Sequence, residues 1–110
     1  MKHYVIDELN RDDIGKLKPY LEAHLHRPTV AGIYWLFLDT EHLSSAQLAH
    51  PDCGAFYFAV ELEAHRLVCE LLVRSEKRIR CECIQYADPE QCLWVIGVID
   101  AILEKLEINA

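Results

Sequence analysis

The middle of the chain, from residue 56 to residue 84, alternates apolar and polar side chains almost without a break. Apolar residues at every second position are typical of a strand that buries one face and exposes the other. Turn-forming residues interrupt the alternation twice, at positions 64–65 and 75–77. The pattern therefore predicts three antiparallel strands over residues 56–63, 66–74 and 78–84, joined by two short turns.

The lengths of the two turns predict which residues face each other. A two-residue turn at 64–65 places Glu63 opposite Arg66. It also pairs Leu62 with Leu67, Val60 with Cys69 and Phe58 with Leu71, and a three-residue turn at 75–77 pairs Val73 with Ile79, Leu71 with Cys81 and Cys69 with Cys83. A shift of one residue would turn each apolar set to the opposite face. We therefore expect the three cysteines of these strands to lie together on the buried face.

The flanking segments add two helices and two further strands. Asp12 and Asp13 offer an N-cap for a helix that ends near residue 27, and Pro19 predicts a kink or a division into two short helices. Asp88, with proline next and glutamine at the third position after it, begins a long helix that runs to about residue 107. Short strands are predicted at residues 3–6 and 33–38.

These elements predict a single α+β domain over residues 1–110. We expect a mainly antiparallel meander sheet of four strands, or five if the first segment joins it. The N-terminal helix and the long C-terminal helix should pack on one face of this sheet, because the alternating strands offer only one strongly apolar face.

Charge and cysteine usage exclude several classes of function. Eighteen Asp and Glu against eleven Lys and Arg give a net charge of −7. This balance argues against nucleic acid or an anionic membrane as the partner, since both attract positive charge. The five cysteines lie mostly in apolar stretches. Buried, reduced cysteines of this kind are typical of a cytoplasmic protein rather than a secreted disulfide framework.

Excess apolar surface predicts an interaction module. The strand at 33–38 has no polar face, and an uncovered apolar edge promotes association. We expect a small, non-catalytic interaction or regulatory domain without a cofactor, most simply a symmetric homodimer. Another protein, or a small apolar ligand held by the aromatic residues around Trp35, is an alternative partner. The expected interface residues are Leu93, Trp94, Leu72, Ile84 and Tyr57.

An alternative function centres on the loop that contains His50, Asp52 and Cys53. A thiol beside an imidazole can form a thiolate nucleophile, with Asp52 orienting the ring. The same loop is also an ordinary turn, since it contains Pro51, an aspartate and Gly54. No known nucleophile motif surrounds Cys53, so the sequence favours the turn.

A metal site is the third interpretation. Cys81 and Cys83 are two residues apart and share one face of the predicted strand, with Cys69 alongside. Zinc would take these thiolates together with His50 or Cys53. Because the predicted strand turns the same positions toward the core, the sequence favours cysteines that pack as small apolar side chains.

Overall fold

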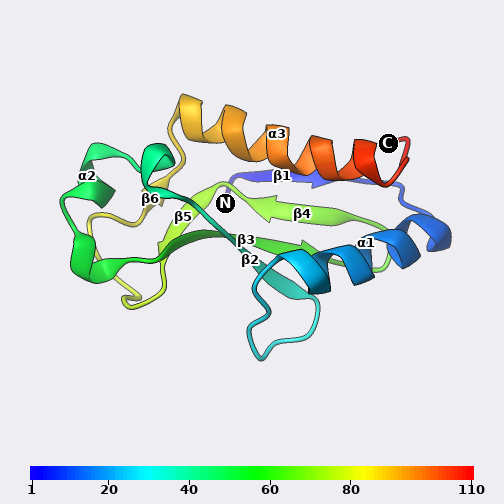
Figure 1. The fold of residues 1–110 in the computed structure, drawn as a ribbon, viewed down its shortest axis with the longest axis horizontal. Helices are drawn as coiled ribbons and strands as arrows, with labels where there is room; N and C mark the ends of the chain where they lie inside the picture. Colours follow the sequence, from blue (N-terminus) through cyan, green and yellow to red (C-terminus); the bar gives the residue numbers. More distant parts are fainter.

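A computed structural model describes all 110 residues as an antiparallel sheet covered by two helices (Figure 1). The strands are β1 (His3–Ile6), β2 (Ile33–Phe37), β3 (Phe56–Leu62), β4 (Leu67–Glu70), β5 (Leu72–Ser75) and β6 (Gln85–Tyr86). The helices are α1 (Arg11–His24), α2 (Ser45–Leu48) and α3 (Pro89–Lys105), with short 3-10 turns η1 (Thr40–His42) and η2 (Pro51–Cys53). The predicted α+β class and the antiparallel sheet are confirmed.

The central strand is β3, which pairs with three neighbours. The strand order is β1-β4-β3-β5-β6, and β2 pairs with the other edge of β3. The core lies between the sheet and the two long helices. It includes Leu17 and Leu21 from α1, Ile99 from α3, and Phe58 and Val60 from β3, all at most 1% exposed. None of the helices combines the length and the apolar composition that a bilayer crossing needs.

Capping boxes begin both long helices. Asp88 and Gln91 form the one predicted for α3, where the Gln91 N–H donates to the Asp88 carboxylate over 2.8 Å. The cap of α1 is Asn10 rather than Asp12 or Asp13, because the Asn10 amide oxygen accepts the Asp13 N–H at 2.8 Å. The helix then continues through Pro19, so its predicted division into two helices is wrong. Buried Leu17 and Leu21 hold the helix on both sides of the proline.

The first predicted hairpin is confirmed in register. Val60 pairs with Cys69 and Leu62 with Leu67. The Arg66 Nε donates to the Glu63 Oε1 at 2.6 Å across the turn.

The register beyond this hairpin is wrong by two residues. Phe58 does not pair with Leu71; instead Tyr57 pairs with Arg74. Leu71 leaves the pairing because its N–H donates to the Lys2 carbonyl at 2.9 Å and its carbonyl accepts the Ala87 N–H at 2.8 Å. The strand is therefore divided into β4 and β5.

The third predicted strand is also wrong, because residues 76–84 form a loop and β6 contains only Gln85 and Tyr86. The pairs predicted for Val73, Leu71 and Cys69 do not form; Val73 pairs with Gln85 instead. Ile79, predicted to face the core, is 93% exposed. The cause is local, since the Ser75 Oγ accepts the N–H groups of Lys77 and Arg78 and turns the chain out of the sheet.

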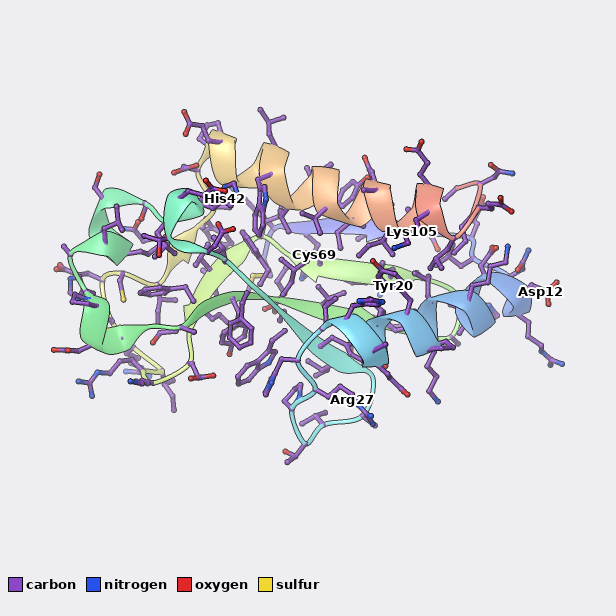
Figure 2. The ribbon with its side chains drawn as sticks, in the orientation of Figure 1. Asp12, Tyr20, Arg27, His42, Cys69 and Lys105 are labelled. Atoms are coloured by element: carbon purple, nitrogen blue, oxygen red, sulfur yellow. The ribbon has the colours of Figure 1, made fainter.

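The loop separates the cysteines that the predicted meander had put together. Cys69 stays in the interior beneath the helices and is 1% exposed (Figure 2). Cys81 and Cys83 lie in the loop rather than on a strand; Cys83 is nevertheless buried, and Cys81 is half-buried.

The residues expected at an interface differ widely in exposure. Leu93 is 75% exposed on α3, whereas Trp94, Leu72 and Ile84 are half-buried. Tyr57 is buried beneath Trp35, with the two rings stacked at 4.0 Å.

Candidate metal centre

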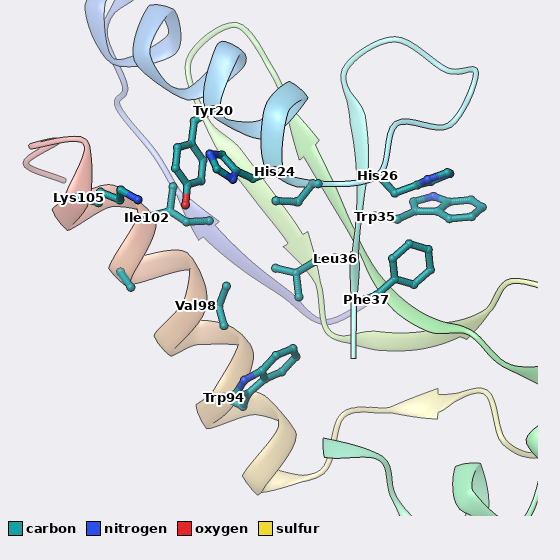
Figure 3. Close-up of a pocket in the computed structure, with 12 residues that line it drawn as sticks. Tyr20, His24, His26, Trp35, Leu36, Phe37, Trp94, Val98, Ile102 and Lys105 are labelled. Carbon is teal, nitrogen blue, oxygen red and sulfur yellow. The ribbon is translucent and has the colours of Figure 1, made fainter. Parts of the chain in front are cut away.

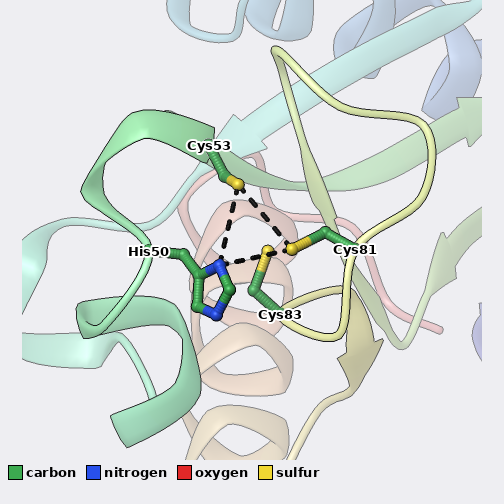
Figure 4. A group of neighbouring side chains, drawn as sticks. All are labelled: His50, Cys53, Cys81 and Cys83. Carbon is green, nitrogen blue, oxygen red and sulfur yellow. Dashed lines mark hydrogen bonds between the residues drawn. The ribbon is translucent and has the colours of Figure 1, made fainter.

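Four metal-ligating side chains meet beside the loop that connects β5 to β6 (Figure 4). They are His50 and Cys53, at η2, and Cys81 and Cys83, in the loop of residues 76–84. One ligand atom from each, the imidazole nitrogen or the Sγ, lies within 4.8 Å of all the others. Cys53 and Cys83 are buried, and His50 and Cys81 are half-buried.

The separations among His50, Cys53 and Cys81 are close to those of a tetrahedral zinc site. Zn–S bonds of about 2.3 Å and a Zn–N bond of about 2.0 Å put two sulfurs roughly 3.8 Å apart and a nitrogen and a sulfur roughly 3.5 Å apart. The Sγ atoms of Cys53 and Cys81 are 3.8 Å apart. The His50 Nδ1 lies 3.3 Å from the Sγ of Cys81 and 4.0 Å from that of Cys53. The donor atoms are therefore spaced for a common ion.

Two tight turns aim the ligands. In η2 the Cys53 N–H donates to the His50 carbonyl at 3.0 Å, with Pro51 at the first position of the turn. In the loop the Ile84 N–H donates to the Cys81 carbonyl at 3.0 Å. The first turn brings His50 and Cys53 together, since turn residues three apart lie close together, and the second turn contains both Cys81 and Cys83.

Buried Ser75 connects the two segments that carry the ligands. Its hydroxyl donates to the Cys53 carbonyl and accepts the Arg78 N–H at 3.1 Å. Beside it, the Glu76 N–H donates to the Ala55 carbonyl at 2.8 Å. One side chain at the end of β5 thus holds η2 against the start of the loop.

Two buried glutamines tie the same region to α3. Gln47 is 1% exposed, and its amide nitrogen donates to the Cys83 carbonyl at 3.3 Å. Its amide oxygen accepts from the Gln91 Nε2 at 2.9 Å, and Gln91 also donates to the His42 carbonyl at 2.9 Å. These bonds fix the Cys83 backbone relative to the helix.

A carboxylate orients the His50 ring. The Nε2 of His50 lies 3.2 Å from the Oε1 of Glu82, while Nδ1 points at the thiols. Metal-bound histidines commonly donate their second N–H to a carboxylate, which fixes the ring and raises its basicity. The prediction that Asp52 orients the ring is wrong: Asp52 is exposed, and the carboxylate in contact is that of Glu82.

The thiols of the cluster differ in acidity. Hydrogen bonds from the backbone and the thiol of Cys83, together with Cys53 and His50 nearby, lower the pKa of Cys81 to about 7. Burial, followed by the hydrogen bonds of the neighbouring thiols, raises the pKa of Cys83 to about 12. Cys81 is therefore the more acidic thiol of its pair.

The structure unites four of the candidate residues that the sequence named and leaves two outside. Cys69 is in the core, where burial raises its pKa to about 12, and Asp52 faces solvent. Sequence reasoning missed Glu82, Ser75 and Gln47. Only Gln47 carries a local signal, because it forms a capping box with Ser44 at the start of α2.

Comparison of the chain with protein-family models, with curated proteins and with solved structures finds no significant match. The arrangement of side chains is therefore the basis for assigning a function.

Proposed function

We propose that the protein binds one zinc ion through His50, Cys53, Cys81 and Cys83, and that the ion is structural. The observation that carries the proposal is the convergence of one imidazole and three thiols within 4.8 Å. Thiolates and imidazole favour zinc over calcium or magnesium, which prefer oxygen. Four protein ligands complete the tetrahedron and leave no position for a substrate, as in structural rather than catalytic zinc sites.

The ion would add to the hydrogen bonds with Ser75 and Gln47 that hold the loop of residues 76–84. Residues 76–84 lack strand pairing, and residues 76–80 are exposed. Zinc would bind Cys81 and Cys83, near the C-terminal end of this loop, and connect them to η2. Ser75 already connects the N-terminal end of the loop to η2 through its bond to the Cys53 carbonyl. A zinc-held loop can display Ile79 in a defined conformation despite its 93% exposure.

Metal analysis of the protein purified without chelator tests the proposal. We expect one zinc ion per chain, retained through gel filtration. Serine in place of Cys53, Cys81 or Cys83 should reduce the zinc content to a small fraction. The matched control is Cys92→Ser, because Cys92 is a half-buried cysteine outside the cluster and should keep the wild-type zinc content.

Folded protein that takes up no zinc from a zinc-containing buffer would contradict the proposal. A second candidate, a metal-free thiol nucleophile, would then gain support from the 3.3 Å contact between the Cys81 Sγ and the His50 Nδ1. In that case Cys81 should react with iodoacetamide faster than a model thiol, and His50→Ala should remove the excess rate.

The biological role that we propose is a cytoplasmic interaction or regulatory module, acting as a homodimer. Reduced cysteines suit this compartment, and the five cysteines form no disulfide. The apolar side chains of Leu93 and Ile79 are 75% and 93% exposed, which supports contact with a partner. Light scattering should give the mass of two chains. The Leu93→Glu variant should have the mass of one chain. A single-chain mass for the unmodified protein at micromolar concentration would refute the dimer.

A further inference from the structure

A groove of about 560 Å³ lies between the C-terminal part of α1, the edge strand β2 and α3 (Figure 3). Leu36 of β2 forms its floor, and Tyr20 and His24 form the α1 wall. The α3 wall consists of residues at helical spacing: Trp94, Val98, Ala101, Ile102 and Lys105. The volume is within the range of about 300–1,000 Å³ that is usual for small-molecule sites.

The groove contains a lysine and no acidic side chain, although the protein as a whole is acidic. Its lining includes His24, His26 and Lys105 and no Asp or Glu, whereas the whole chain carries −7. Two acids of the same helices are engaged elsewhere. The Glu22 carboxylate accepts from the Tyr34 hydroxyl at 3.4 Å, and the Asp100 carboxylate accepts from the Tyr4 hydroxyl. The groove therefore favours an anion.

The two ends of the groove differ in character: Lys105 and His24 lie at one end and Trp94 at the other. Lys105 and His24 both lie against the Tyr20 ring, with the Lys105 Nζ 5.6 Å and the His24 ring 4.2 Å from its centroid. Trp94 lies at the other end (Figure 3). Its indole stacks on His42, with the ring centroids 4.3 Å apart. Between the two ends the surface consists of aliphatic side chains.

We infer that this groove binds a small aromatic anion. The anionic group would lie at the Lys105 and His24 end, and the aromatic body would lie along the aliphatic surface toward Trp94. The size of the groove suits a molecule of two or three rings, and its apolar lining rewards burial of those rings. This inference does not depend on the metal centre, because the groove shares no residue with the four proposed ligands.

Fluorescence titration of the zinc-loaded protein with anilinonaphthalene sulfonate tests the inference. We expect saturable binding of one probe per chain and quenching of the tryptophan emission, since both tryptophans of the chain line the groove. Naphthoate should displace the probe at lower concentration than the neutral naphthylmethanol. Lys105→Met should weaken probe binding about fivefold, the effect expected of a partly exposed charge contact.

Two pairs of variants locate the site. Lys16→Met removes an exposed charge of α1 outside the groove and should leave affinity unchanged. Ala101→Phe narrows the groove from an exposed position and should abolish binding of the sulfonate and of its neutral analogue phenylnaphthylamine. Ala23→Phe adds the same ring at an exposed position of α1 outside the groove and should leave the binding of both compounds unchanged.

Three results would overturn the inference. One is the absence of saturable binding, and another is an equal loss of affinity in the Lys105 and Lys16 variants. The third is a dimer whose dissociation exposes the groove, because a second copy of the chain would then be its occupant. Each result can be read even if the protein proves to lack zinc.

Discussion

The imidazole of His50 contacts thiols of both ligand segments through one nitrogen and a carboxylate through the other. Its Nδ1 faces the thiols of Cys53 and Cys81, and its Nε2 faces Glu82. Glu82 is itself exposed and lies between Cys81 and Cys83 in the sequence. The loop that supplies two proposed ligands therefore also supplies the group that orients the ring of a third.

We predict that Glu82→Gln lowers zinc affinity about 10-fold without loss of the fold, because it removes the charged partner of the His50 ring and no ligand. Competition with a chromophoric zinc chelator measures the change. Glu76→Gln, an exposed glutamate of the same loop, is the control and should have the wild-type affinity. Equal affinities for the two variants would show that Glu82 does not orient the ring.

Tyr4 anchors the first strand to the last helix through its hydrogen bond to Asp100. This bond, with burial and the charge of Asp100, raises the pKa of Tyr4 from 10.0 to about 12. The folded protein therefore keeps a proton that the unfolded chain loses. The stabilisation is complete below pH 10 and is lost as the pH rises toward 12.

We predict that Tyr4→Phe lowers the free energy of unfolding by about 1 kcal/mol at neutral pH, the usual contribution of such a hydrogen bond. The difference from wild type should shrink as the pH rises through the alkaline range. Urea denaturation at several pH values measures it. Tyr86→Phe is the control, since that exposed hydroxyl contacts only the sulfur of Met1, at 3.6 Å. A difference for Tyr4→Phe that stays constant with pH would contradict the assignment.

Among the elements, buried amides connect the segment 39–53, which contains η1, α2 and η2, and the ligand loop to α3. Gln47 is the centre of this network, since it contacts the Ser44 N–H, the Cys83 carbonyl and the Gln91 amide. A buried polar group that loses its partners must be desolvated without compensation. The position of the loop should therefore depend strongly on this one side chain.

We predict that Gln47→Leu lowers the free energy of unfolding by about 2–4 kcal/mol, because it leaves several buried polar groups without partners. Chemical denaturation of the zinc-loaded protein gives the value. Gln85→Leu is the matched control on the exposed strand β6 and should change stability by less than about 0.5 kcal/mol. If Gln47→Leu also changed the free energy of unfolding by less than about 0.5 kcal/mol, water would be taking over the hydrogen bonds of the lost amide.

For the whole molecule, the metal centre adjoins one end of a core that is mostly built from other residues. The core contains 19 buried residues, and only Cys53 and Cys83 among them belong to the proposed ligands. A chain of 110 residues can sustain such a core without metal. Zinc should therefore stabilise one end of the molecule rather than create the fold.

We predict that chelation lowers the melting temperature but leaves the far-ultraviolet circular dichroism nearly unchanged. Hydrogen exchange should increase in the loop of residues 76–84 and at η2, while the amides of β3 stay protected. Global unfolding on chelation would mean that the metal is part of the folding nucleus. No change in exchange would mean that the cluster holds no structural ion.

Local interactions were enough to predict several elements from the sequence. The capping box of Asp88 and Gln91 places the start of α3, since its hydrogen bonds span three residues. The two-residue turn at 64–65 determined the pairing of Leu62 with Leu67 in the same way. The four proposed ligands could also be named, because thiols and imidazoles are recognisable by type.

The convergence of the four ligands, in contrast, depends on long-range packing. Cys81 and Cys83 were predicted on a buried strand because their neighbours alternate in polarity, and alternation does not distinguish a strand from a loop held by long-range contacts. Ser75 accepts backbone N–H groups that the strand would have used, and Leu71 bonds to Lys2 and Ala87. The Ser75 bonds to Lys77 and Arg78 are local, but those of Leu71 and the bond from the Ser75 hydroxyl to the Cys53 carbonyl join residues far apart in the chain. The competition between strand and loop is therefore resolved only when the whole molecule packs.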